Sequence, residues 1–452
     1  KIEHELGGMF DGAHGAGLAS VWGSWARYVY HLDEARFANY GRKVWNIDEE
    51  NDEKTAVAAI EKTEEFFRSL HMPTCLEDMK MGVQPDEVLK EMMPYLTTEY
   101  GNASSLYSIG RKAKRAIENA RKQVAELINC DPHEIYFTGS GSESDNTALK
   151  GFAYANKEKG NHIITSKIEH HAILESCETL EKQGFEVSYI NVDENGVVKL
   201  EELKKAIKPS TILISIMTAN NEIGTIQPIE KIAKIAHEQN ITFHTDAVQA
   251  IGNMPIDVQK LQIDMLSLSG HKINAPKGIG ALYIKNGINV EKYINGGHQE
   301  RDKRAGTENV AGIVGLGKAC ERSNKNMLTH IKNLSKLRDY YLSKLEKEIP
   351  GKFRINGGME NRLPGNANIS FAGINSSELI YKLDEMGICV SSGSACSSGS
   401  VTPSHVLTAI NVPELYLNSA IRTTFGDNNT FEQINYLIKC LKKICLSLDK
   451  DW

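Results

Sequence analysis

The sequence lacks several features that mark large classes of protein. It has no long basic run, and its formal net charge of -6 gives no electrostatic footprint for nucleic acid. No apolar stretch reaches the roughly 18 residues that a transmembrane helix needs, and no signal peptide follows Lys1. The eight cysteines lie at irregular spacing with no Cys-x-x-Cys pair. They therefore predict reduced thiols in a cytoplasmic protein rather than a disulfide framework.

What remains is an ordinary globular composition, 41% hydrophobic and 24% charged, in a chain of 452 residues that predicts two or three domains. Residues 1–80 differ from the rest because they hold three of the four tryptophans. Helical patterns run through them, for example over 55–69, where Ala59, Ile60, Phe66 and Phe67 form an apolar stripe. We expect a helical segment here that packs as an appendage.

From about Val83 onward, apolar strands alternate with helical patterns such as 109–127 and 229–238. This alternation predicts an α/β domain over 83–325 with a mainly parallel sheet covered on both faces. A long charged helix over about 323–347 then leads into a smaller C-terminal α/β domain, 326–452, with a strand at 368–371 and a last helix at 431–446. The seven strands predicted for the large sheet are 134–137, 162–165, 187–190, 211–217, 242–244, 265–268 and 281–284.

One thiol stands in a segment that cannot pack in a core. Cys396 lies within Ser-Ser-Gly-Ser-Ala-Cys-Ser-Ser-Gly-Ser, residues 391–400. Glycine and serine let a loop swing and leave the thiol exposed, whereas a structural cysteine is normally buried among aliphatic side chains. The pattern therefore favours a reactive thiol on a mobile loop.

A lysine follows one of the predicted strands, in Ser-Gly-His-Lys at 269–272. An amine placed there, with Ser269 and His271 as polar neighbours, can attack a carbonyl and form a Schiff base. For a lone lysine the commoner interpretation is a surface residue in a turn. The neighbouring motifs favour the chemical one for Lys272.

Polar groups end a second strand, in His-Thr-Asp-Ala-Val-Gln at 244–249. The carboxylate of Asp246 can keep a pyridinium nitrogen protonated, which makes a pyridoxal ring an electron sink, and Gln249 can donate to its phenolic oxygen. Alone, Asp246 could equally be a helix N-cap.

A turn rich in glycine and serine follows the first predicted strand, in Thr-Gly-Ser-Gly-Ser-Glu-Ser at 138–144. Backbone N–H groups at a helix start can bind a phosphate. The segment matches neither the Walker A pattern nor G-x-G-x-x-G, so it does not imply a nucleotide. A plain capped turn is the alternative.

Three further residues complete the candidate set. His170, in Ile-Glu-His-His-Ala, can stack on a ring and move protons near neutral pH. Its neighbour His171 does not make the pair a metal site, because adjacent side chains do not converge readily on one ion. Asn221 and Arg422 are candidates for binding a substrate carboxylate, which the guanidinium fork matches.

Taken together and in order, these stretches resemble the cysteine desulfurases, pyridoxal-phosphate enzymes of the class V aminotransferase group. The resemblance covers about 83–446 and rests on IEHHA, NNEIGT, HTDAVQ, SGHKINAPKGIGALYI, RAGTENV and SSGSACSSGS. The thiol loop is similar to the long-loop branch, which supplies iron–sulfur cluster assembly and thiolation. The resemblance implies a fold type I transferase with a seven-stranded large domain, a small C-terminal domain and a homodimer.

The resemblance also implies a role for each candidate. Lys272 would hold pyridoxal 5'-phosphate as a Schiff base and then act as a general base, and Cys396 would attack the sulfur of L-cysteine to leave alanine and an enzyme persulfide for an acceptor protein. The other implied roles are ring stacking by His170, electronic tuning by Asp246 and Gln249, phosphate binding by Gly141, Ser142, Ser269, His271 and a second subunit's Thr307, and substrate orientation by Asn221 and Arg422.

Two departures accompany the resemblance. Family members usually begin with a short strand close to Tyr-Leu-Asp-Asn-Ala-Ala-Thr-Thr, whereas Met79-Lys-Met-Gly precedes Val83 here. Residues 1–80 resemble instead the C-terminal helical end of iron-containing alcohol dehydrogenases, with His14 matching one metal ligand. One histidine does not hold iron, so we predict no metal site and no dehydrogenase activity.

Three other functions compete with the desulfurase. A selenocysteine lyase would use the same cofactor, and an inactive fusion remnant without the first strand would bind it poorly. A plain aminotransferase or racemase is disfavoured, since neither needs a thiol on a mobile loop.

Overall fold

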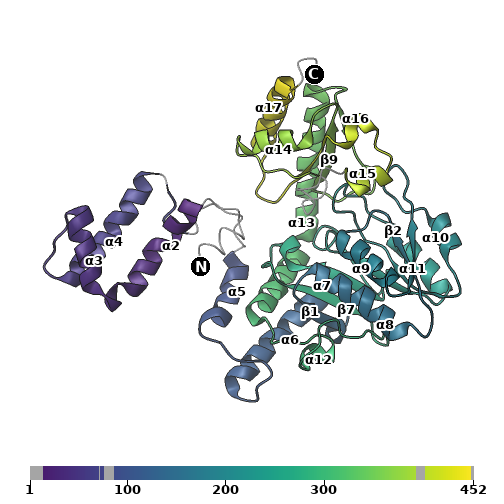
Figure 1. Ribbon diagram of the computed structural model, residues 1–452, viewed down its shortest axis with the longest axis horizontal. Coiled ribbons are helices and arrows are strands. Elements are labelled where there is room, and N and C mark those ends of the chain that lie inside the picture. Colours follow the sequence, from purple (N-terminus) through teal and green to yellow (C-terminus); the bar gives the residue numbers. More distant parts are fainter. Residues whose placement is uncertain (1–13, 71, 76–85, 393–402, 449–452) are drawn as a thin grey trace. The chain divides into compact units, whose positions relative to one another are not determined.

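The computed structural model describes residues 14–70, 72–75, 86–392 and 403–448, which belong to two compact units, 1–86 and 87–452 (Figure 1). Cys396 and the segment at Met79 lie outside the described residues, as does the side chain of His14. Within the described ranges, no helix is long and apolar enough to cross a membrane.

The first unit is helical, as predicted. Its helices α2, α3 and α4 pack around small side chains, and Ala59 and Ile60 of α4 are fully buried. The predicted stripe is wrong at Phe66, which is 44% exposed. The buried face of α4 runs instead through Thr63, whose hydroxyl lies 2.8 Å from that of Tyr40. The elements are α2 (His14–Val29), η1 (Tyr30–Leu32), α3 (Glu34–Tyr40), η2 (Gly41–Trp45) and α4 (Asp52–Ser69).

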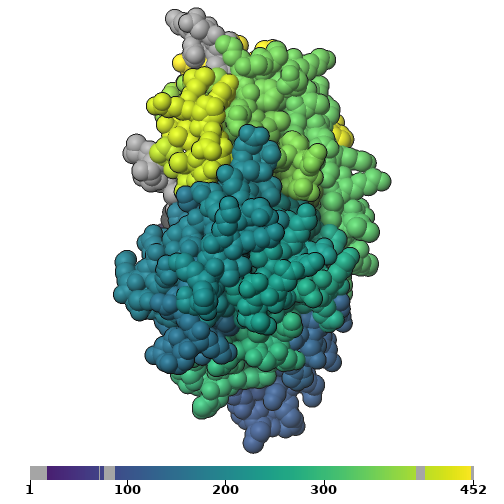
Figure 2. Space-filling view, turned by 90° about the vertical axis from the view of Figure 1, so that its right-hand side faces the viewer, coloured from purple at the N-terminus to yellow at the C-terminus, as the bar shows by residue number. Residues whose placement is uncertain are grey.

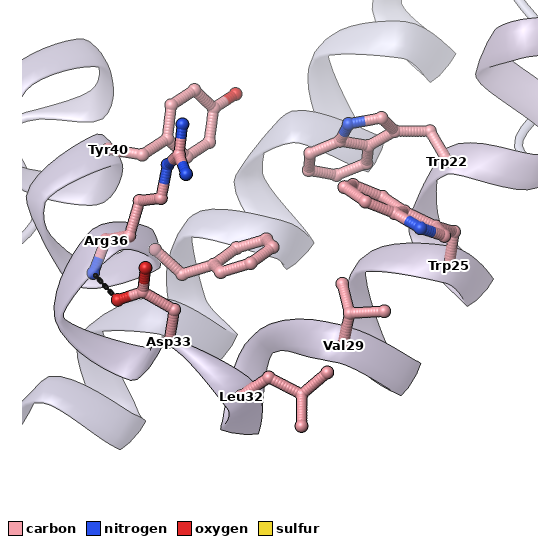
Figure 3. Close-up of a pocket in the computed structure, with 8 residues that line it drawn as sticks. Trp22, Trp25, Val29, Leu32, Asp33, Arg36 and Tyr40 are labelled. Carbon is pink, nitrogen blue, oxygen red and sulfur yellow. Dashed lines mark hydrogen bonds between the residues drawn. The ribbon is translucent and has the colours of Figure 1, made fainter.

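An open hollow lies on this unit and is lined mostly by apolar side chains from α2 and α3 (Figure 3). Its polar members are Asp33 and Arg36, and the backbone N–H of Arg36 donates to Asp33 Oδ1 at 3.2 Å. The apolar lining residues are Trp22, Trp25, Val29, Leu32, Phe37 and the ring of Tyr40.

The second unit contains the predicted seven-stranded sheet, in the order β1-β7-β6-β5-β4-β2-β3. All neighbouring strands are parallel except around β7, which pairs antiparallel with both β1 and β6. The sheet is thus mainly parallel, and the predicted fold class is confirmed. The strands are β1 (Ile135–Thr138), β2 (His162–Ser166), β3 (Glu186–Ile190), β4 (Thr211–Ser215), β5 (Thr242–Asp246), β6 (Met265–Ser269) and β7 (Gly280–Ile284).

The central strands β2, β4, β5 and β6 are buried along most of their length, because helices cover the sheet. The helical elements as far as the turn before β7 are α5 (Asp86–Thr97), α6 (Ser108–Ile128), η3 (Pro132–Glu134), α7 (Gly141–Asn146), η4 (Thr147–Gly151), α8 (Phe152–Asn156), α9 (His171–Glu181), α10 (Leu200–Ala206), α11 (Ile229–Glu238) and η5 (Gly270–Ile273).

The long helix α13 (Val310–Glu348) begins well before the predicted residue 323. The glycines of this first part weaken its helical signal in the sequence. In the structure they let α13 approach its neighbours closely, since a Cβ on Gly317 would lie 2.7 Å from that of Ala120 in α6, and one on Gly315 would meet Met92. Asn309 caps the helix by accepting from the N–H of Gly312.

A second, three-stranded antiparallel sheet, β10-β9-β8, has a separate hydrophobic core built with α14, α17 and the C-terminal half of α13. The C-terminal residues, yellow in Figure 2, lie over one end of the teal body formed by residues of the large sheet and its helices. The remaining elements are α12 (Gln299–Asp302), β8 (Phe353–Ile355), β9 (Asn366–Phe371), α14 (Ser376–Asp384), α15 (His405–Ala409), α16 (Glu414–Leu417), β10 (Ala420–Thr424) and α17 (Phe431–Leu448).

Candidate active site

The candidate site lies at the carboxyl ends of the parallel strands, where α/β sheets usually bind ligands. Asp246 is the last residue of β5 and pairs with Ser267 of the neighbouring β6, which ends at Ser269. Lys272 follows in the turn η5, which closes at Asn274 in the left-handed conformation (φ 62). Burial raises the pKa of Asp246 and lowers that of His170, while the charge of Lys272 opposes the first shift and adds to the second.

A helix start lies beside these strand ends, because α7 follows β1 directly. The Ser140 hydroxyl caps it by accepting from the N–H of Glu143 at 3.1 Å. Gly141 has no room for a side chain, since a Cβ there would lie 2.7 Å from Val248 Cγ2 and 3.2 Å from Ser269 Cβ. The start of α7 is therefore packed against the end of β6 and the residues after β5, and its backbone N–H groups can bind an anion there.

His170 caps α9 and has a defined tautomer. Its Nδ1 accepts from the N–H of Ala172 at 3.1 Å, so its ring proton is on Nε2. Burial, followed by the charges of His171 and Lys272, lowers its pKa to about 4. The ring is therefore neutral at physiological pH.

Asp246 belongs to a buried polar cluster. Burial raises its pKa to about 6, although the N–H of Val248 donates to its Oδ1 at 2.8 Å and Lys272 is near. Beside it, burial and the charge of Asp246 raise the pKa of the Asp145 carboxyl well above its usual range. His244, on β5, lies between the hydroxyls of Ser215 and Ser267 at 2.9 and 3.0 Å. A cationic group beside Asp246 would offset the cost of burying its charge.

Asn221 and Arg422 come together although 201 positions separate them in the sequence. Arg422, on β10, donates from Nη1 to the backbone oxygen of Asn221 at 2.7 Å. The backbone of Ser391 pairs with Arg422 in both directions, at 3.2 and 2.6 Å. The predicted carboxylate-binding pair thus adjoins the start of the serine-rich segment.

A family model described as aminotransferase class V matches residues 82–437. The chain belongs to this family. A second model, the C-terminal part of the Fe-containing alcohol dehydrogenase family, matches residues 1–93. Both resemblances predicted from the motifs are thereby confirmed.

Curated members of the class V family that resemble this chain closely are named cysteine desulfurases. The cysteine desulfurase IscS of Clostridium botulinum strain Hall is 53% identical over 360 residues, which are 79% of this chain and 90% of that relative. The IscS of Methanosarcina thermophila is 52% identical over 362 residues, or 80% and 89% of the two chains. A solved structure titled NifS-like protein matches with a TM-score of 0.76 and 39% identity, covering 80% of this chain and 96% of that one.

Class V aminotransferases use pyridoxal phosphate, and the residues at the strand ends fit that group. The helix start at Gly141 suits its phosphate, the buried carboxyl of Asp246 suits its ring nitrogen, and the neutral imidazole of His170 suits the face of its ring. The predicted cofactor is therefore confirmed.

Within the described ranges, four predicted residues make no side-chain hydrogen bond to the other candidates. Ser142 and Gln249 accept through their backbone oxygens from Asn146 and Asn253. His271 and Thr307 are exposed. The roles assigned to them from the resemblance stay predictions.

Sequence reasoning passed over several buried groups that support the site. Glu169 accepts from Ser166 Oγ at 2.5 Å and from the N–H of Met217, and burial raises its pKa to about 8. Glu222 and Asp145 are also buried carboxyls. The available signal was a charged residue inside each motif, Glu in IEHHA and in NNEIGT.

Proposed function

We propose that the chain is a cysteine desulfurase that converts L-cysteine to L-alanine and keeps the sulfur as a persulfide on Cys396. The observation that carries the proposal is that Asp246, Lys272 and His170 lie at or just after the carboxyl ends of the parallel strands β5, β6 and β2, in a chain about half identical to cysteine desulfurases. The described part of the chain presents no cluster of three or more His, Cys, Asp or Glu side chains that could hold a metal ion.

Pyridoxal phosphate, when bound, supplies an electron sink for negative charge at the substrate Cα. Lys272 holds the cofactor through its Nζ and later moves the proton at the substrate Cα. Asp246 keeps the proton on the ring nitrogen, since a buried carboxylate favours a cation beside it. His170 would offer the ring an uncharged imidazole with its proton on Nε2.

Asn221 and Arg422 orient the cysteine carboxylate, because the guanidinium is already fixed to the Asn221 carbonyl. The Cys396 thiolate then attacks the cysteine sulfur. A sulfur–sulfur bond forms, the substrate Cβ–S bond breaks, and a proton at Cβ completes alanine. The outer sulfur of the persulfide is then transferred to an acceptor protein of iron–sulfur assembly or thiolation, which leaves Cys396 as a thiol again.

We also propose that the chain forms a homodimer in which Thr307 reaches the partner's cofactor phosphate, and the exposure of Thr307 supports this contact. We further propose that the protein works in the cytoplasm. The seven described cysteines support this location, because all are free thiols, as a reducing compartment would leave them.

The test is to locate the persulfide. The chain, loaded with pyridoxal phosphate, is incubated with L-cysteine, alkylated and digested, and the added sulfur is mapped by mass spectrometry. We expect it on Cys396 and not on Cys389, the exposed thiol that serves as the internal control. A Cys396→Ala variant should keep the cofactor and lose the persulfide. Undiminished persulfide in that variant, or sulfur found on Cys389 alone, would contradict the proposal.

A further inference from the structure

A buried carboxylate occupies the junction between the two sheets of the second unit. Glu222 follows Asn221 directly and is 0% exposed. Its Oε2 accepts from Ser404 Oγ at 2.6 Å, while its Oε1 is buried without a hydrogen-bond partner among the described residues. Its backbone oxygen accepts from the amides of Asn366 and Asn368 on β9. A half-satisfied buried acid is costly for the fold, which calls for a functional reason.

The partner of this carboxylate begins α15. The Ser404 hydroxyl also accepts from the N–H groups of Val406 and Leu407 at 3.1 and 3.3 Å, so it caps the helix and binds Glu222 at once. His405 Nε2 lies 3.0 Å from the backbone oxygen of Glu169, the residue before His170. The start of α15 is thus attached to two loops of the large sheet. In the sequence, Ser404 lies eight residues after Cys396.

Asn221, the residue before Glu222, is linked to Ser391, which precedes Cys396 in the sequence as Ser404 follows it. The Asn221 carbonyl binds Arg422, whose backbone pairs with Ser391. Burial raises the pKa of Glu222, and the Ser404 hydroxyl and the Arg422 charge lower it, so the carboxylate also responds to that guanidinium. Two consecutive residues of one loop therefore hold both serines. Asn221 holds Ser391 through Arg422, and Glu222 holds Ser404 directly.

We propose that Glu222 is a positioning residue that fixes Ser404, and so limits the reach of the Cys396 thiol, at the place where Asn221 fixes Arg422. The inference rests on the proposed desulfurase function. Eight residues span at most about 29 Å from a fixed point. Release of that point enlarges the volume that the thiol samples and lowers its effective concentration at the substrate sulfur.

The proposal predicts a loss in kcat without a matching change in KM. Ser404→Gly removes the hydroxyl that Glu222 binds, and glycine is a tolerated N-cap. We expect kcat for alanine release to fall about tenfold, which corresponds to about 1.4 kcal/mol, with KM for L-cysteine within twofold. The matched control is Asn375→Gly, because Asn375 caps a different helix, α14, by accepting from the N–H groups of Ser377 and Glu378. It should leave kcat unchanged.

The conservative variant separates positioning from bulk stability. Glu222→Gln keeps an oxygen that can accept from Ser404 and should retain most of kcat, whereas Glu222→Ala should match Ser404→Gly. The double variant Glu222→Ala/Ser404→Gly should lose no more than either single variant, since both remove one contact. Additive losses, or a control as impaired as Ser404→Gly, would overturn the proposal.

Hydrogen exchange needs no catalytic activity, so it tests the role of Glu222 separately from the proposed desulfurase function. Amide hydrogen exchange of α15 should become faster in Glu222→Ala and Ser404→Gly, and stay near the wild-type rate in Glu222→Gln. If the wild-type chain released no alanine, the proposed function would fail, while exchange would still decide whether Glu222 holds α15. Unchanged exchange in both disruptive variants would overturn the positioning role.

Discussion

Asp246→Asn should make the cofactor-free chain more stable at neutral pH. Burial raises the pKa of Asp246 from 3.8 to about 6, against the opposing effects of the Val248 N–H and of Lys272. A carboxyl whose folded pKa exceeds its unfolded pKa binds more protons in the native state between those two values. The contribution of Asp246 to the free energy of unfolding is therefore fully present below about pH 4, and it is lost as the pH rises through about 6.

The size of this loss follows from the shift. At 1.36 kcal/mol per pH unit, a rise from 3.8 to about 6 corresponds to a loss on the order of 3 kcal/mol at pH 7 and above. Asparagine carries no charge and can still accept from Val248 through Oδ1. The variant should thus recover most of that free energy without the cofactor. With the cofactor bound, the variant should lose activity, since no carboxylate holds the ring nitrogen protonated.

Thermal unfolding followed by circular dichroism at pH 5 and pH 8 measures the effect. Tryptophan fluorescence would report mainly the other unit, because three of the four tryptophans lie in residues 1–86. We expect the variant to unfold a few degrees higher at pH 8. At pH 5, which lies about halfway between 3.8 and 6, the gain should be about half as large. Asp257→Asn is the control of opposite sign, since the Lys260 N–H lowers the pKa of Asp257. No gain at pH 8, or an equal gain at both pH values, would refute the reasoning.

Three further changes test the site. Lys272→Ala should abolish alanine release and the absorbance of covalently bound cofactor, which a spectral titration would show; full activity would contradict its assigned role. Gly141→Ala should weaken pyridoxal-phosphate binding about ten- to hundredfold, because its Cβ meets atoms at 2.7 Å, whereas Gly426→Ala, whose Cβ meets nothing closer than 3.9 Å, should not. Arg422→Ala should raise KM for L-cysteine about tenfold or more with the cofactor retained, and an unchanged KM would exclude Arg422 from substrate binding.

The parts of the fold that the sequence predicted are those with strong local signals. Buried strands such as 162–166 and 265–269 are short apolar runs that end in polar motifs, so both their existence and their ends were readable. The start of α13 was not readable, because Gly315 and Gly317 resemble a loop until the helices that they contact are known. Likewise, nothing in the composition of β7 distinguishes an antiparallel strand from its parallel neighbours.

The site divides in the same way. Lys272 and Asp246 could be predicted because each follows a strand, and parallel strands bring such ends together. The contacts of Glu222 with Ser404 and of Arg422 with Asn221 join residues about 200 positions apart. Such pairs depend on tertiary packing, which no local pattern encodes.

Alanine release from L-cysteine by the purified chain, reconstituted with pyridoxal phosphate under reducing conditions, tests the central claim most directly. The desulfurase proposal predicts alanine from the wild-type chain and none from Cys396→Ala, with the cofactor bound in both. Cofactor bound to the wild-type chain without any alanine would contradict it.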